Sequence, residues 1–213
     1  MSAYTDQEEL DKLKTWWKEY GTALIIGVAI GVALLFGGKF WKSYQEQQRQ
    51  EASALYERML SAQRRQDVGA VRDAGNKLEQ DYSRTPYAAL AALTLARTAV
   101  EAGDVAGARA QLDTAIKLGG GTAVEHVARL RLARLMLDAR EADSVLALIP
   151  SKQVAGFEAD YLELKGDALT ALGKRADAAA AYQEAAKYAR QGRAATSLTL
   201  KLDEFSASNP KNH

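Results

Sequence analysis

The chain has 213 residues, and 28 basic residues nearly balance 27 acidic residues, for a net charge of +1. This balance argues against a nucleic-acid-binding protein, which would need an excess of lysine and arginine on one face. The absence of cysteine excludes disulfide bonds, cysteine-ligated metals and thiol nucleophiles.

The first predicted element is an uncharged run at residues 20–38. As a helix, its nineteen residues would cover about 28 Å, close to the thickness of a bilayer core. Aromatic residues flank both ends as in membrane-interface belts, namely Trp16, Trp17, Tyr20, Phe40, Trp41 and Tyr44. The sequence therefore predicts one transmembrane helix at 20–38, preceded by a short segment at 1–19.

Two alternatives to a transmembrane helix stay open. A cleaved signal peptide would start with basic residues, whereas Asp6, Glu8, Glu9 and Asp11 precede this run. A buried core helix of a soluble protein would usually be shorter and amphipathic. Lysines and arginines are equally frequent beside the two ends, so charge does not predict which side of a membrane holds the rest of the chain.

Small residues recur within the run, where Ala23, Gly27 and Gly31 fall four positions apart. On a helix they share one face, and such a face lets another membrane helix approach closely. The pattern predicts membrane helix packing, although glycine is also frequent in membrane helices where it has no packing role.

Residues 55–192 contain four imperfect copies of a helix-turn-helix pattern. The copies share a small residue in the first helix, at Ala62, Ala96, Ala133 and Gly166, which are 34, 37 and 33 positions apart. This period is typical of tetratricopeptide units, whose helix pairs stack into a solenoid. A generic alanine-rich bundle would also show helical periodicity, but it has no reason to repeat at this interval.

The remaining segments complete an all-α protein, in which a single N-terminal transmembrane helix precedes a tetratricopeptide-repeat-like α-solenoid. Residues 39–66 predict a helical stalk that runs into the first repeat, since they are polar from Tyr44 to Gln66 and contain no glycine or proline there. The second helix of the third copy is predicted to stop at Ile149, before Pro150. Residues 193–207 predict a capping helix, and 208–213 predict a frayed tail.

Four stretches in this order carry a family resemblance: Gly21 to Trp41, Tyr87-Ala88-Ala89-Leu90-Ala91, Leu130-Arg131-Leu132-Ala133-Arg134 and Lys165-Gly166-Asp167-Ala168-Leu169. Behind an anchor of this type they resemble the YfgM-like ancillary subunits of the Sec translocon. The resemblance implies a single-pass protein of the bacterial inner membrane, with a cytoplasmic amino terminus and a periplasmic repeat domain. It also implies three kinds of partner: the Sec translocon, a membrane-tethered periplasmic chaperone of the PpiD type, and secretory polypeptides.

No catalytic or metal-binding pattern accompanies these features, so the sequence predicts neither an enzyme nor a cofactor. His126 follows a glycine loop and is predicted to lie at the surface or at a helix end. The candidate binding site is instead the inner face, which the first helix of each repeat lines. Its predicted partner-binding residues are Leu90, Leu93, Arg97, Val100, Val127, Leu130, Arg134 and Leu137, with an acidic end at Asp160, Glu163 and Asp167.

Two functions are compatible with this reading. The first is a non-enzymatic, membrane-anchored adaptor or chaperone-type protein at the Sec translocon, which binds a periplasmic chaperone and emerging chains through its repeats. The alternative is a membrane-tethered regulator that sequesters a cytoplasmic signalling partner through residues 1–19.

Overall fold

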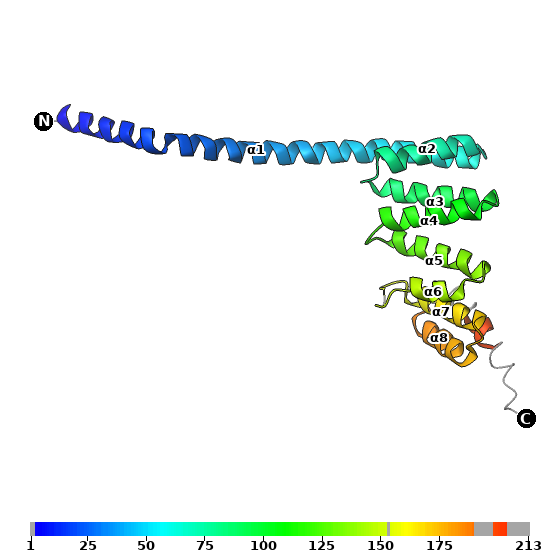
Figure 1. Ribbon diagram of the computed structural model, residues 1–213. Coiled ribbons are helices and arrows are strands. Elements are labelled where there is room, and N and C mark those ends of the chain that lie inside the picture. The colour runs from blue at the N-terminus through cyan, green and yellow to red at the C-terminus, as the bar shows by residue number, and fades with distance from the viewer. Residues whose placement is uncertain (1–2, 153, 190–197, 204–213) are drawn as a thin grey trace, which may run out of the picture. The chain divides into compact units, whose positions relative to one another are not determined.

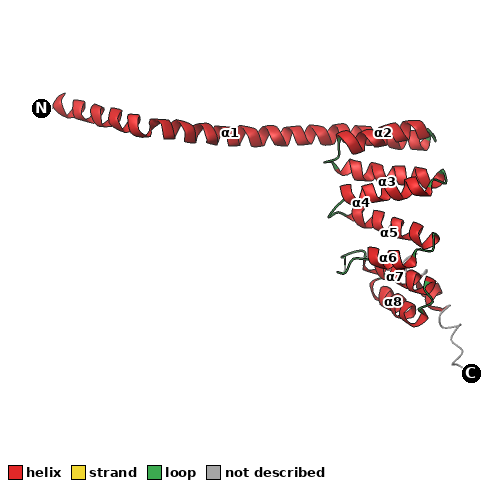
Figure 2. Ribbon diagram, viewed as in Figure 1, coloured by secondary structure: helices red, strands yellow, loops and turns green. Residues whose placement is uncertain are grey.

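The computed structural model describes residues 3–152, 154–189 and 198–203, with side chains except those of 3–13, 29–30 and 32–37. Every regular element within these residues is a helix, as Figure 2 shows. The chain divides into two units, residues 1–51 and 52–213. Of the predicted carboxyl-terminal segments, 198–203 are helical, whereas 193–197 and 204–213 lie outside the described residues.

Helix α1 (Ala3–Arg64) contains the first unit and enters the second. The predicted transmembrane helix at 20–38 is wrong for the part of the chain that the structure describes, where no helix is both long and apolar enough to cross a membrane. The uncharged run is not a separate segment, because α1 continues through charged residues on both sides of it. The same finding overturns the predicted single-pass inner-membrane localisation.

The second unit consists of helices that follow one another in a stack (Figure 1). After the end of α1, these are α2 (Val68–Asp81), α3 (Pro86–Glu101), α4 (Val105–Leu118), α5 (Ala123–Asp138), α6 (Ala142–Leu148), α7 (Glu158–Ala171) and α8 (Arg175–Tyr188). Helices α3 and α4 pack as a pair, as do α7 and α8, and the second helix of each pair packs on the first helix of the next. This arrangement is that of an α-solenoid, in which each pair contacts its neighbours.

The turn inside each pair has the same construction. Its central residue has a positive φ, at Gln66, Gly103, Arg140 and Gly173. The next residue donates its N–H to the carbonyl oxygen five positions earlier, as Asp104 does to Ala99 at 2.8 Å. This is the bond that closes a Schellman motif, and it satisfies a carbonyl that the ending helix leaves free. Four copies of one turn therefore set the repeat.

The turns also correct the register of the first copy. Counting seven residues back from the positive-φ residue leads to Met59, Ala96, Ala133 and Gly166, all buried. The sequence pattern instead assigned Ala62 to this position, three residues too late. Both Met59 and Ala62 face the core, because residues three apart share a helix face. A pattern based on small residues therefore fits Ala62, although the larger Met59 occupies the equivalent position.

The core is distributed along the stack rather than gathered in one place. One cluster joins α3, α4 and α5 through Leu93, Leu112 and Leu132, and the next joins α5, α6 and α7 through Leu130, Val145 and Leu164. Helix α6 has only seven residues and ends at Leu148, before the extended Ile149 that precedes Pro150. This end confirms the prediction, since proline disfavours helical geometry in the residue before it.

Candidate functional site

The predicted inner-face residues do not form one continuous apolar groove. Leu93 and Leu130 are only 9% and 4% exposed and belong to core clusters between helix pairs. The other predicted apolar residues are half-buried at Leu90, Val127 and Leu137 and exposed at Val100. Both predicted arginines, Arg97 and Arg134, are exposed, so the accessible surface of this face is more polar than the sequence suggested.

The two arginines occupy equivalent positions but have different surroundings. Arg97 Nε contacts Glu101 Oε1 at 2.7 Å, one helical turn further along α3. Asp138 follows Arg134 at the same interval, yet its side chain is shorter and no ion pair joins Arg134 to a described residue. Arg134 lines a pocket instead.

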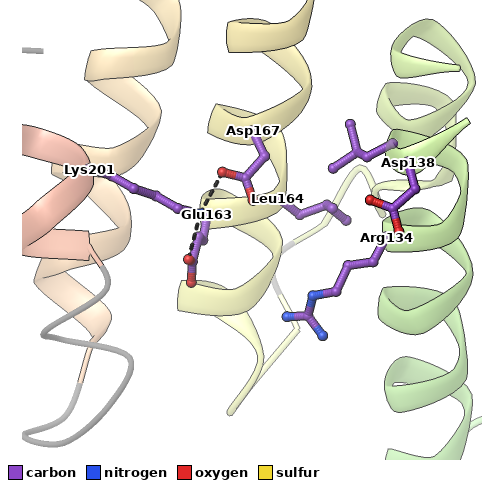
Figure 3. Close-up of a pocket in the computed structure, with 7 residues that line it drawn as sticks. Arg134, Asp138, Glu163, Leu164, Asp167 and Lys201 are labelled. Atoms are coloured by element: carbon purple, nitrogen blue, oxygen red, sulfur yellow. Dashed lines mark hydrogen bonds and ion pairs between the residues drawn. The ribbon is translucent and has the colours of Figure 1, made fainter. Parts of the chain in front are cut away.

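This pocket, which we call the α5–α7 pocket, has a volume of about 340 Å³. Figure 3 shows Arg134 and Asp138 on α5, Leu164 of α7 pointing towards them, and Lys201 reaching Glu163 and Asp167 of α7 from a third segment. The complete lining is Arg134, Leu137, Asp138, Glu163, Leu164, Asp167 and Lys201. Three carboxylates and two cations give the pocket a formal charge of −1.

Lys201 is held by the two carboxylates of α7. Its Nζ donates to Glu163 Oε1 at 2.7 Å and to Asp167 Oδ1 at 2.5 Å, and it lies 5.4 Å from the centroid of the Tyr182 ring. Burial opposes the charged form of Lys201, but the bonds to Asp167 and Glu163 outweigh it and raise the pKa of Lys201. Lys201 therefore contributes a positive charge to the lining of the α5–α7 pocket.

Tyr182 of α8 also binds Asp167, one of the carboxylates that line the pocket. Burial raises the pKa of the Tyr182 hydroxyl, which stays protonated and donates to Asp167 Oδ1 at 2.7 Å. Asp167 thus accepts bonds from Lys201 and Tyr182 together. Sequence reasoning identified Glu163 and Asp167 but missed Lys201 and Tyr182. The available signal was that Lys201 lies three residues after Leu198, on the same face of a helix.

A second polar cluster joins the beginnings of α5 and α7. His126 was predicted to lie at the surface or at a helix end; it lies in the first turn of α5 and is half-buried, with Nδ1 at 3.0 Å from the Tyr161 hydroxyl and its ring 5.1 Å from that of Phe157. Both partners come from the next repeat, more than thirty residues away in the sequence, so a local pattern could not reveal them. The cluster connects two repeats, and nothing in it suggests catalysis.

Two further predictions concern other parts of the chain. Among the described residues, no group of three His, Cys, Asp or Glu side chains could hold a metal ion. At Gly27 and Gly31, the described part of the chain places nothing within 4 Å of an added Cβ. The predicted packing stripe through Ala23, Gly27 and Gly31 therefore has no partner within the described residues and stays a prediction.

Known proteins resemble this chain over most of its length. A family model described as a tetratricopeptide repeat-like domain matches residues 14–207. The ancillary SecYEG translocon subunit of Haemophilus influenzae is 29% identical over 180 residues, which cover 84% of this chain and 88% of the relative. Proteins of the same name from Aggregatibacter actinomycetemcomitans and Escherichia coli are 31% and 29% identical, over 86% and 85% of this chain and 90% and 87% of their own lengths.

These matches confirm the resemblance drawn from the sequence, and they include the helix pairs that carry the α5–α7 pocket. The family model alone spans far more than half of the chain. The chain therefore belongs to the tetratricopeptide repeat-like family of ancillary SecYEG translocon subunits.

Proposed function

We propose that this protein is a non-enzymatic adaptor at the Sec translocon. We propose further that the inner face, formed by the first helix of each repeat, binds a segment of a partner protein. The observation that carries the proposal is the match to ancillary SecYEG translocon subunits over most of both chains. The partners proposed for this face are a PpiD-like chaperone and secretory polypeptides in addition to the translocon.

The exposed charges of this face support binding of a polypeptide segment. Arg97 and Arg134 stand at equivalent positions of adjacent repeats, and the carboxylates Asp138, Glu163 and Asp167 follow towards α7. A bound segment would place a carboxylate near the arginines, where charge-assisted hydrogen bonds are strong. Because Arg97 already pairs with Glu101, Arg134 is expected to make the larger contribution.

Affinity isolation after mild crosslinking tests this proposal. We expect Arg134→Ala to reduce co-purification of SecYEG and of the chaperone about tenfold, because a lost charge-assisted contact costs roughly 1.5–3 kcal/mol. Arg97→Ala should have a smaller effect, and the double variant the largest. Arg131→Ala is the matched control, since Arg131 is also exposed on α5 but does not line the pocket.

Unchanged co-purification in the Arg97→Ala and Arg134→Ala double variant would show that the partner interface does not lie on this face. A version that lacks residues 1–19 serves as a further arm. If it lost a signalling partner while it kept SecYEG, the regulator alternative would replace the adaptor.

A further inference from the structure

A short helical segment of the chain itself rests on the last helix pair. Leu198 is only 1% exposed and packs in a cluster with Leu169, Tyr182 and Ala185, and Leu202 is half-buried against the same cluster. Lys201, between the two leucines, binds Glu163 and Asp167. The segment 198–203 therefore docks through two apolar side chains and one cation.

The spacing of these three residues explains why one face of a short helix presents them together. Positions i, i+3 and i+4 lie on the same side of a helix, and Leu198, Lys201 and Leu202 have this spacing. The receiving surface is complementary. It offers the apolar cluster of α7 and α8 to the leucines and two carboxylates to the lysine.

The charges of the α5–α7 pocket show what the site would hold without this segment. Lys201 is one of its two cations, so the remaining lining has three carboxylates against Arg134, a formal charge of −2. Such a site favours a cationic side chain, and the leucine cluster beside it favours apolar neighbours. The ion pairs of Lys201 are partly exposed, and a partly exposed ion pair contributes little net stability. A partner helix with the same Leu, Lys and Leu spacing would make the same contacts and compete with the resident segment.

We propose that the surface of α7 and α8 beside the α5–α7 pocket is a docking site for a short basic amphipathic helix with Leu, Lys and Leu in this spacing. Residues 198–203 occupy the site as an intramolecular ligand, and a partner helix of the same chemistry replaces them. The proposal rests on the proposed use of this face for partner binding, and it adds that the acidic end recognises a lysine.

The direct test uses the full chain and a fluorescein-labelled synthetic peptide with the sequence of residues 194–207. Fluorescence anisotropy measures peptide binding to the wild type and to Lys201→Glu, in which the resident segment loses both ion pairs and is repelled by α7. We expect Lys201→Glu to bind the peptide at least tenfold more tightly than the wild type, because its site is vacated. Lys201→Gln, which removes the charge without repulsion, should change the affinity in the same direction by a smaller factor.

Two controls distinguish specific recognition of the lysine from nonspecific binding of the peptide. The same peptide carrying Lys201→Glu should bind Lys201→Glu protein at least tenfold more weakly than the unmodified peptide does. Arg131→Glu is the matched charge reversal at an exposed residue of α5 that does not line the pocket, and its peptide affinity should equal that of the wild type. Circular dichroism melting verifies that each protein variant keeps its helices.

Equal binding of the two peptides, or no gain in the Lys201→Glu and Lys201→Gln proteins, would overturn the proposal and leave 198–203 as a permanent cap. No translocon protein takes part in this test. Its failure therefore leaves the adaptor proposal to the co-purification experiment.

Discussion

Two of the four turns place a residue other than glycine where the backbone is left-handed. Arg140 has a φ of 63°, whereas Gly103 occupies the equivalent position with a φ of 74°. A side chain costs roughly 1 kcal/mol in this conformation, and glycine avoids that cost but loses more backbone entropy on folding. We expect Arg140→Gly to raise the free energy of unfolding by a few tenths to about 1 kcal/mol.

Gly103→Ala should have the opposite effect, with a loss of about 1 kcal/mol, because nothing surrounds the added Cβ and only the backbone is strained. Urea denaturation of both variants measures the two changes. Destabilisation by Arg140→Gly would show that the Arg140 side chain contributes more than its turn geometry costs.

Glu125 links the loop before α5 to the helix itself. Its carboxylate accepts from the Gly121 N–H at 2.8 Å and from Arg129 at 2.5 Å, and these bonds, the one to Gly121 foremost, lower the pKa of Glu125. A lowered folded-state pKa means that the stabilisation is present above the unfolded value of 4.5 and is lost as pH falls through the folded value. The contribution at neutral pH is on the order of 1 kcal/mol.

Glu125→Gln should therefore be less stable than the wild type at neutral pH by that amount, and the difference should shrink under acid conditions. Urea denaturation at neutral pH and at about pH 3 gives the comparison. A difference that stayed constant over this range would mean that the carboxylate charge of Glu125 is not what stabilises the loop.

At the scale of the helix pair, Gly166 allows α7 and α8 to approach closely. An added Cβ would overlap the Tyr182 ring, which the bond to Asp167 holds in place. We expect Gly166→Ala to lower the free energy of unfolding by roughly 1–3 kcal/mol through overpacking. Thermal melting followed by circular dichroism measures the change.

Gly69→Ala is the matched control within a helix. Its Cβ would meet Asp67 Oδ1 at an ordinary 3.7 Å, so the higher helix propensity of alanine should stabilise the protein by up to about 1 kcal/mol. An unchanged melting temperature for Gly166→Ala would mean that Tyr182 can move away at no cost.

Local sequence signals predicted the elements that depend on local rules. The end of α6 before Pro150 follows from proline sterics, and Thr122 caps α5 by accepting from Val124 N, which is the role that threonine favours at the start of a helix. The predicted leucine groove was less reliable. Leu93 and Leu130 have the same helical spacing as their half-buried neighbours, and only packing between repeats decides which leucines are fully buried.

The candidate site itself was predicted in part. Arg134, Glu163 and Asp167 were identified from their place in the repeat, but Lys201 completes the pocket from 34 residues beyond Asp167. Such a contact depends on how a segment docks, which no short-range pattern encodes. The transmembrane prediction was wrong for the part of the chain that the structure describes, where no helix is long and apolar enough to cross a membrane.

At the scale of the second unit, stability is shared between neighbouring pairs. Arg109 of α4 forms two hydrogen bonds of 3.0 Å with Glu141 at the start of α6, and the His126 and Tyr161 contact joins α5 to α7. Each link connects adjacent pairs, as expected of an array in which every repeat is stabilised by its neighbours. A destabilising substitution in one helix pair is thus expected to lower the stability mainly of the adjacent pairs.

The constant turn inside each pair has a consequence for how such a protein tolerates changes in length. Residues 82–85 connect α2 to α3 with four residues, whereas 149–157 connect α6 to α7 with nine. The turn hydrogen bonds leave no room for added residues within a pair, but connections between pairs already differ in length. Extra residues beside the exposed Ser151 and Lys152, between α6 and α7, would therefore leave the stacking geometry unchanged, which makes this position a suitable insertion point for a reporter or a crosslinking group.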